Sequence, residues 1–563
     1  MKRFFILYSS IIAIATLRLS AQEGVYERAY AHTDKTCYVA GEEVWVKLYV
    51  TDNHFHPSSL SKVGYIEILD TERPVVQTKL ALDEGSGSGK FKIPAGTPSG
   101  NYQLVAYTRY MRNESAPVFF RKQIAIINTF QASPNDRVEL IEETPQASPG
   151  QISATQCIQL NADRNSYAHR MPVSVNIDGL PADITDLTLS VVCNDSLTIT
   201  PLGNMDNWRK LVTTPPTQFS GKFIPEYEGH IIQGRLKAVD DAPLLPQHIK
   251  MHSSSIAFVG KDISYVQGQI DSVGNISYYT GSVYGRQDLV ASTESDESAN
   301  YQAVIVSPFS ETFPKTLPPL ALYPNKEWLE KRSIGVQLQQ IFKADSLTGE
   351  LQPVDLSCYH LQPQLSYDLN EYTRFDTMEE TIIEFVRRII VRKMDGKRRL
   401  KVLKEGEKRF NQGSTLVMLD GIPLYDHEEI LNYNPRLIRR IDIYSGRYVF
   451  GGATFECMVF FTTHKSNLPG IQLKENSQMT VYECPTLPVA FAAPEYKNEA
   501  ARQSRMPDYR HTLYWNPSVE KSEGRPLTLT FYTSDLSGAY KVIAEGFTAK
   551  GEPIRGETSF LVE

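Results

Sequence analysis

The sequence predicts a multidomain, mainly β protein, built of several antiparallel β-sandwiches and one small α/β domain. Short segments in which apolar and polar residues alternate, separated by turn signals, dominate the chain up to about residue 325. The length of 563 residues suggests about four domains, and an apolar content of 41% supports packed cores. A helical pattern over 377–388 lies among strand patterns between 345 and 466, and it predicts the α/β domain.

The N-terminus predicts an export signal over residues 1–21. Lys2 and Arg3 give a positive start, residues 4–17 form an apolar run, and Ala21 precedes the expected cleavage point. We therefore expect a mature chain that begins at Gln22. An apolar run of about 14 residues is too short to span a bilayer, and no later segment approaches about 18 apolar residues. The mature chain is expected not to be transmembrane.

The first sandwich is predicted over residues 22–143. Residues 44–50 alternate strictly, with Val and Leu on one face and Trp45, Lys47 and Tyr49 on the other. The segments AHTDKTCYVAGEEVWVKLYV (31–50) and GNYQLVAYT (100–108) resemble the second domain of α-macroglobulins, as found in many exported Bacteroidota proteins. That family's pattern is Tyr-x-Ala-Gly-Glu-x-hydrophobic-x-Phe-Lys, and here Val46 stands where Phe is common. The resemblance covers about 25–128 and implies a macroglobulin-like, immunoglobulin-like sandwich.

The remaining boundaries follow from composition and strand spacing. A Pro-rich stretch at 144–150 predicts a domain boundary, and the helical pattern that begins at Lys326 predicts a connector. The segments expected after the first sandwich are a sandwich at 151–240, a sandwich at 241–322, a helical connector at 323–344, an α/β domain at 345–466, a linker at 467–505 and a C-terminal sandwich at 506–563.

The α/β domain carries the most informative motifs. Leu419-Asp420-Gly421-Ile422-Pro423 ends a strand on an Asp-Gly turn, the segment 437–446 alternates and ends on glycine, and a Gly-Gly pair follows at 451–452. These motifs resemble the plug domain of TonB-dependent outer-membrane receptors. Such a receptor needs about 22 strands of about 10 residues, and only 98 residues follow Lys465 (563 minus 465). The resemblance therefore implies a plug-like domain without its own barrel; the alternative is a generic small α/β domain.

Patterns that carry catalytic or metal chemistry are weak in this chain. No Cys precedes Gly-Glu-Gln, so the thioester of α-macroglobulins is absent, and the six cysteines form no C-x-x-C pair. Cys157 and Cys193 could bridge one sandwich; the favoured alternative is a set of small buried residues. His54 and His56 have a metal-ligand spacing but are expected to be solvated loop residues. We expect no catalytic residues, no cofactor and no metal site.

A basic run offers a candidate for binding. Between Arg387 and Lys404 the chain has nine basic residues and one acidic residue, with a predicted hairpin turn at 394–397. A solvated hairpin is one interpretation; the other is a patch that meets an acidic partner rim or lipopolysaccharide phosphates. Tyrosines cluster near the glycines of the same domain, and Tyr is enriched at interfaces. The candidate partner-binding residues are Arg392, Lys393, Lys397, Arg398, Tyr444 and Tyr448.

These observations favour a non-catalytic protein of the periplasm or outer membrane. The plug resemblance implies an accessory subunit that acts with an outer-membrane barrel from another chain or with a surface complex. A formal net charge of −7 argues against nucleic-acid binding. An adhesin or glycan-binding module and a hydrolase with an unrecognised active site are the alternatives. The identity of the partner, the disulfide state and the oligomeric state stay open.

Overall fold

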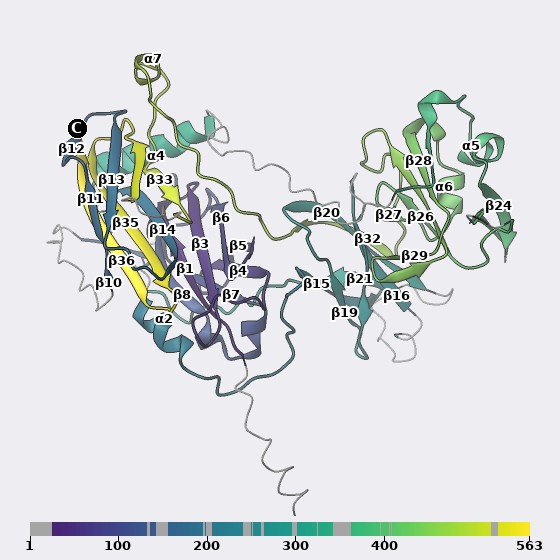
Figure 1. Ribbon diagram of the computed structural model, residues 1–563, viewed down its shortest axis with the longest axis horizontal. Coiled ribbons are helices and arrows are strands. Elements are labelled where there is room, and N and C mark those ends of the chain that lie inside the picture. The colour runs from purple at the N-terminus through teal and green to yellow at the C-terminus, as the bar shows by residue number, and fades with distance from the viewer. Residues whose placement is uncertain are drawn as a thin grey trace, which may run out of the picture.

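The computed structural model shows a mainly β molecule with two lobes joined by long connectors (Figure 1). The prediction of a multidomain, mainly β protein is confirmed. The expected export signal, the boundary at 144–150 and the start of the α/β domain lie outside the described residues. The structure describes residues 25–131, 136–141, 156–194, 197–198, 205–239, 249, 252–260, 264–295, 301–323, 325–341, 362–394, 396–404, 406, 408–519 and 527–563.

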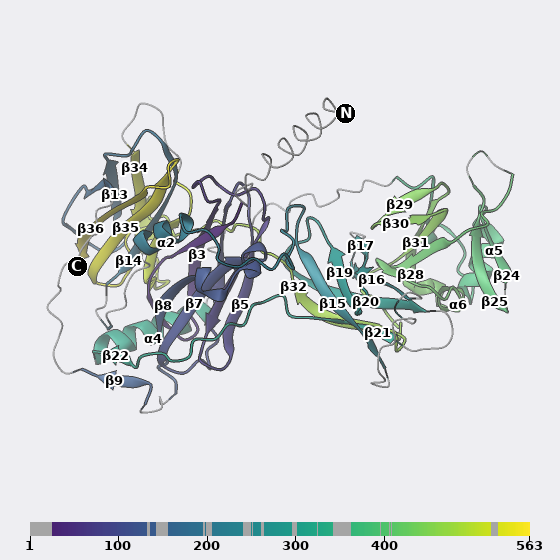
Figure 2. The same cartoon turned by 90° about the horizontal axis from the view of Figure 1, so that it is seen from below.

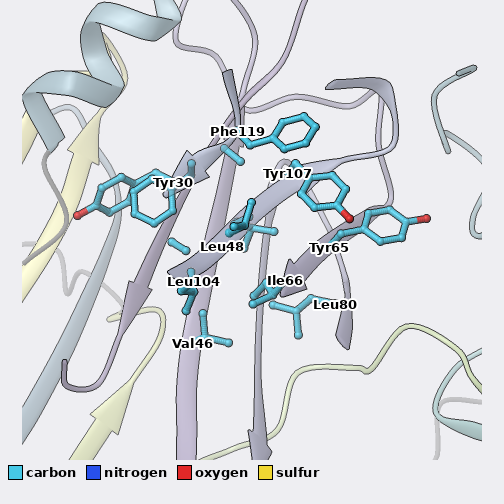
Figure 3. Close-up of a cluster of buried hydrophobic side chains, with 14 of the residues drawn as sticks. Tyr30, Val46, Leu48, Tyr65, Ile66, Leu80, Leu104, Tyr107 and Phe119 are labelled. Carbon is cyan, nitrogen blue, oxygen red and sulfur yellow. The ribbon is translucent and has the colours of Figure 1, made fainter. Parts of the chain in front are cut away.

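Sandwich 1 is formed by two facing sheets from residues 28–127. One sheet has the order β1-β3-β6 and the other β2-β8-β7-β4-β5. The inward-facing valines, leucines and tyrosines of the two sheets pack into one core, which Figure 3 shows around Leu48, Ile66 and Tyr107. Its strands are β1 (Arg28–Thr33), β2 (Cys37–Val39), β3 (Glu43–Thr51), β4 (Val63–Leu69), β5 (Pro74–Ala81), β6 (Ser86–Lys92), β7 (Gly100–Thr108) and β8 (Phe120–Ile127).

The alternation predicted along β3 is present, but both of its faces are buried. Trp45, Lys47 and Tyr49, which lie on the face opposite the valines and the leucine, are each at most 6% exposed. Sandwich 2 covers that face: Lys47 forms an ion pair of 2.7 Å with Asp186, and the Tyr49 hydroxyl bonds to Thr188. A second sandwich thus stacks on the first. The alternation of apolar and polar residues along one strand could not predict this contact.

Sandwich 2 is assembled from two distant parts of the chain. Its first sheet has the order β10-β36-β35-β14-β33, with β12 beside β36, and its second sheet has the order β11-β13-β34. Five of these strands come from 156–193 and four from 512–562. They are β10 (Gln156–Cys157), β11 (Gln159–Ala162), β12 (Ser166–Tyr167), β13 (Pro172–Asp178), β14 (Ile184–Cys193), β33 (Thr512–Asn516), β34 (Leu527–Tyr532), β35 (Gly538–Thr548) and β36 (Pro553–Val562).

Sandwich 3 lies in the other lobe and is also discontinuous. Its sheets have the orders β18-β19-β15-β21 and β17-β16-β20-β32. The last strand, β32, follows the α/β unit in sequence. The strands are β15 (Ile231–Ala238), β16 (His252–Phe258), β17 (Ser264–Gln267), β18 (Gln269–Ile270), β19 (Asn275–Tyr279), β20 (Arg286–Ser295), β21 (Tyr301–Ile305) and β32 (Ser477–Glu483).

The α/β unit, residues 365–463, is contiguous in sequence. Its mixed sheet has the order β23-β28-β31-β26-β27, with β26 and β31 parallel. The predicted helix is present as α5 (Met378–Phe385), which begins at a capping box formed by Thr377 and Glu380. The other elements are β23 (Leu365–Asp368), β24 (Ile389–Met394), β25 (Lys397–Val402), β26 (Thr415–Leu419), β27 (Ile422–Pro423), α6 (Glu428–Leu431), β28 (Ile438–Tyr444), β29 (Tyr448–Phe450), β30 (Ala453–Phe455) and β31 (Cys457–Thr463).

The sheet pairing corrects the expected linear order of domains. The α/β unit is inserted into sandwich 3, and sandwich 3 is inserted into sandwich 2, so the segments are nested rather than consecutive. Residues 506–563 are therefore not a separate sandwich, 151–240 is shared between two sandwiches, and the expected linker 467–505 contains β32. The physical reason is that β14 hydrogen-bonds to β33 and β35 across more than 300 residues, whereas alternation reports only local strand formation.

The remaining elements close the surfaces of the first lobe. Helix α2 (Met205–Val212) packs Trp208 against both Tyr30 and Phe547, and so joins sandwiches 1 and 2. Helix α4 (Lys326–Ile341), expected to be a connector, packs on sandwich 1, where Arg332 pairs with Glu42 at 2.7 Å. Strands β9 (Val138–Leu140) and β22 (Leu320–Leu322) pair in parallel, and α7 (Glu499–Arg502) interrupts the connector to β33. None of the helices in the described residues is long and apolar enough to cross a membrane.

A buried polar network joins the two lobes where β4 of sandwich 1 meets the chain entering β15. The Glu226 carboxylate accepts hydrogen bonds from Tyr65 (2.9 Å) and from the backbone N–H of Ile231 (2.8 Å), and His230 Nδ1 lies 2.8 Å from it. His230 Nε2 is 2.8 Å from the hydroxyl of Tyr482 on β32. Burial lowers the pKa of His230, so the ring is neutral near pH 7.

Candidate partner-binding surface

The basic run forms the antiparallel hairpin β24–β25, as the sequence predicted. Met394 pairs with Lys397, and Gly396 in the turn has a φ of +80°, a conformation that glycine adopts without strain. The hairpin lies at the end of the molecule opposite the C-terminus in both views (Figures 1 and 2). The surface formed by the exposed cations of β24–β25 is called the hairpin surface below.

Three of the predicted binding residues are exposed on the hairpin surface. Arg392, Lys393 and Lys397 are all exposed, with the side chains of Arg392 and Lys397 on one face of the hairpin and that of Lys393 on the other. The Arg392 guanidinium lies 5.7 Å from the centre of the Phe410 ring, which orients it without neutralising its charge. These three side chains are therefore open to solvent.

Arg398 is not available in the same way, because carboxylates of the same unit already hold it. Its Nη1 bonds to Glu379 on α5, its Nε lies 3.4 Å from Glu428 on α6, and its Nη2 lies 3.0 Å from Asn432. The backbone N–H and the guanidinium of Arg398 together lower the pKa of Glu428. Arg398 therefore fastens the hairpin to both helices, which corrects its assignment as a partner contact.

The hairpin is held by further bonds that the sequence did not indicate. Arg399 Nη1 donates to the carbonyl of Tyr425 at 2.6 Å, and Lys401 Nζ donates to the carbonyls of Gln412 and Gly413. His427 Nδ1 accepts from the N–H of Leu400 at 2.9 Å. Burial lowers the pKa of His427 to about 4, so the neutral ring can accept this bond near pH 7.

The two predicted tyrosines belong to an interface within the chain. Tyr444 is 5% exposed and packs in a cluster with Phe450, Phe460 and Tyr265 of sandwich 3. The Tyr448 hydroxyl is hydrogen-bonded to Gln364, at 3.2 Å from Oε1 and 2.8 Å from Nε2. Tyr444 cannot contact a partner on the folded surface, so its assignment is corrected: the aromatic cluster fastens the α/β unit to sandwich 3.

The glycine motifs also serve this internal interface. Gly421 has a φ of +87°, and a Cβ there would lie 2.7 Å from the carbonyl oxygen of Phe258 on β16. Gly451 has a φ of +58°, and a Cβ would lie 2.0 Å from the carbonyl oxygen of Tyr265 on β17. The carbonyl of Gly451 accepts from the N–H of Gln267 at 2.7 Å. Glycine is required at both positions because two backbones approach closely.

The Asp420 carboxylate organises the turn between β26 and β27. It is buried, with a φ of +46°, and it accepts bonds from Thr463 N, Thr463 Oγ1 and Leu468 N at 2.7 to 2.9 Å. The strained backbone is thus held by three bonds that anchor the end of β31. This is a structural function. Thr463 N donates to Oδ1, whereas Thr463 Oγ1 and Leu468 N donate to Oδ2, so the turn uses both carboxylate oxygens and an amide has only one acceptor oxygen.

The structure also describes the histidine pair and the cysteines that the sequence analysis singled out. His54 and His56 are stacked, with ring centres 6.2 Å apart, and Asp52 accepts bonds from both backbone N–H groups. Within the described residues, no group of three or more His, Cys, Asp or Glu side chains is placed to hold a metal ion. Cys193 is buried in sandwich 2, and the side chain of Cys157 lies outside the described residues.

Comparison with known proteins identifies one domain. A family model described as the MG2 domain matches residues 28–121, which span nearly all of sandwich 1. The chain therefore contains a macroglobulin-like domain, in agreement with the predicted resemblance. A comparison with curated proteins gives no match.

Solved structures with partial similarity include two bacterial α-2-macroglobulins and an adhesin. For the Escherichia coli α-2-macroglobulin activated by porcine elastase, identity is 8%, coverage is 95% of this chain and 44% of that chain, and the TM-score is 0.24. For the Salmonella α-2-macroglobulin reacted with methylamine, identity is 8%, coverage is 95% of this chain and 39% of that chain, and the TM-score is 0.21. For the Yersinia pseudotuberculosis adhesin InvE, identity is 10%, coverage is 51% of this chain and 61% of that chain, and the TM-score is 0.13. The chain spans less than half the length of these two macroglobulins, and scores this low carry no argument about domain arrangement.

Proposed function

We propose that this protein is a non-catalytic, exported accessory subunit that binds an outer-membrane barrel or a surface complex made by other chains. In this proposal the hairpin surface is the contact, and the α/β unit is a plug-like domain displayed by the sandwiches. The protein would act in the periplasm or at the outer membrane. The MG2 domain supports a protein-binding role at this coarse level.

One observation carries the proposal: three cations are exposed at the far end of the molecule, on a hairpin that is bonded to the remainder of the α/β unit. Arg398 bonds to α5 and α6, and Arg399 and Lys401 bond to backbone carbonyls, so Arg392, Lys393 and Lys397 are presented in a defined arrangement. A fixed set of like charges at a protruding end favours association with an acidic surface, because complementary charge raises the encounter rate.

The test is recovery of partners from detergent-solubilised outer membranes, identified by mass spectrometry. The variant Arg392→Glu/Lys393→Glu/Lys397→Glu should lose the barrel or surface protein that the wild type recovers at low salt. A matched control reverses Lys210, Lys222 and Lys315, which are exposed cations outside the α/β unit and give the same change in net charge. Equal recovery of every partner by both variants and the wild type would contradict the proposal; release of a bound glycan instead would favour an adhesin.

A further inference from the structure

Strand β32 is the edge strand of sandwich 3. In the sheet β17-β16-β20-β32 it pairs only with β20, in antiparallel register, with Met479 opposite Val290. The bonds at both ends fix which residues face β20: Cys484 N donates to Gly285 O at 2.8 Å, and Thr293 N donates to Asn476 O at 3.0 Å. Because alternate residues of a strand bond to alternate sides, Met479 and Val481 direct their backbone groups away from the sheet.

Among the described residues this edge is open, whereas the edges of β5 and β17 are covered. Among the described residues, none hydrogen-bonds to the outward backbone groups of Met479 or Val481. By contrast, the edge of β5 is covered by the connector that follows β32, through Ala81 N to Thr486 O at 2.9 Å and Thr486 N to Lys79 O at 2.8 Å. The edge of β17 is covered by Gly451 of the α/β unit.

The sequence of β32 lacks the features that keep edge strands from pairing. Its residues, Ser-Gln-Met-Thr-Val-Tyr-Glu, include no proline and no lysine, and the charge of Glu483 stands at the end. The side chains of Met479 and Val481 are 47% and 50% exposed. Exposed apolar side chains beside free backbone groups are the features that accept another strand.

We propose that β32 pairs with β32 of a second copy of this chain, antiparallel and around a two-fold axis at Thr480. In this register Met479 of each copy lies opposite Val481 of the other, and Ser477 lies opposite Glu483. The outward residues of both strands then form the hydrogen-bonded pairs, as the antiparallel pattern requires. Each apolar side chain meets an apolar side chain, and no like charges are opposed. A contact that one surface makes with itself closes as a dimer.

The first test is the mass in solution, measured by sedimentation velocity over a range of concentrations. The wild type should form a dimer, and Val481→Lys should shift the midpoint of dimerisation to at least tenfold higher concentration. Leu561→Lys is the matched control: Leu561 is 47% exposed, but its strand β36 is paired on both sides, with Ser166 and with Ala539. A wild type that stays monomeric up to its solubility limit, or a Val481→Lys variant that dimerises like wild type, would overturn the proposal.

A second test checks the register. Residue 480 of one copy would face residue 480 of the other in a non-hydrogen-bonded pair, with Cα atoms about 4.5 Å apart, a separation within the range that a disulfide spans. Thr480→Cys should therefore give a covalent dimer under mild oxidation. Gln478→Cys should not, because residue 478 would lie opposite residue 482. Equal cross-linking of both variants would contradict this register.

Discussion

The base, formed by sandwiches 1 and 2, and the α/β unit use charge in opposite ways. In the base, Glu545 is buried and lies 3.5 Å from His32 and 3.8 Å from Arg555, and it accepts a bond from Tyr30 at 3.2 Å. In the α/β unit, Arg392, Lys393 and Lys397 lie in solvent without a carboxylate bonded to them among the described residues. Charge is paired within the fold in the first region and exposed to solvent in the second.

The two regions also differ in how the chain builds them. The base interleaves strands that are more than 300 residues apart, whereas the α/β unit is formed by one continuous segment. A region built from interleaved segments loses many contacts when any segment is removed. A contiguous region can be changed, or displayed, without disturbing the remainder. The predictions below test this difference, in order of decreasing effect.

Truncation after residue 505 should abolish the folding of sandwich 2. It removes β33 and β35, which flank β14, and β34, which pairs with β13. Amides of β13 and β14 should then exchange hydrogen as in an unfolded chain, as measured by mass spectrometry. Residues 362–476 expressed alone should keep protected amides in β26, β28 and β31. Persistent protection of β14 in the truncated chain would show that the nesting is not required.

Glu545→Gln should lower the free energy of unfolding of the base by about 3–5 kcal/mol, because Arg555 and Lys122 lose a buried counter-charge. Burial alone would raise the pKa of Glu545, but His32, Arg555 and Lys122 outweigh it and lower the pKa. Glu43→Gln is the control. Glu43 lies on β3 of the base and forms a partly exposed pair with Lys90 at 2.9 Å, so its loss should cost under about 1 kcal/mol. Urea denaturation that gives equal losses would remove the proposed difference between buried and exposed charge.

Acid should destabilise the base through His32. Burial lowers the pKa of His32 to about 4 from an ordinary 6.5, so the unfolded state binds the proton first. Stability is therefore full above about pH 6.5 and is lost as the pH falls from there towards 4, by about 2 kcal/mol between about pH 7 and about pH 5. In His32→Gln, the urea concentration at the midpoint of unfolding of the base should change less with pH over this range. An unchanged profile would mean that other groups carry the loss.

The local strands and helices of this fold could be predicted from the sequence, but the pairing of the strands could not. The alternation at 44–50 indicated a strand, and the pattern over 377–388 indicated a helix, because both signals are formed by neighbouring residues. The strands 527–532 and 540–544 look like consecutive partners, yet β34 and β35 belong to different sheets of sandwich 2. Their true neighbours, β13 and β14, lie far away in sequence, and no local pattern encodes that choice.

The candidate site shows the same limit. The basic hairpin and its turn were evident from the spacing of nine cations around Gly396. What the sequence could not show is that Arg398 is held by Glu379 and Glu428, or that Tyr444 faces Tyr265 of another domain. Both facts depend on tertiary packing. A charged or aromatic residue is available for binding only when no other residue of its own chain pairs with it or buries it.

The most direct test of the account compares stability and association in one variant. Arg392→Glu/Lys393→Glu/Lys397→Glu should change the free energy of unfolding by no more than about 0.5 kcal/mol per site, because these side chains are exposed. Its association rate with a partner recovered from outer membranes should fall at least tenfold at low salt. The difference from wild type should shrink as salt shortens the Debye length below about 8 Å. An unchanged association rate at low salt, with the fold intact, would contradict the claim that the hairpin surface binds a partner.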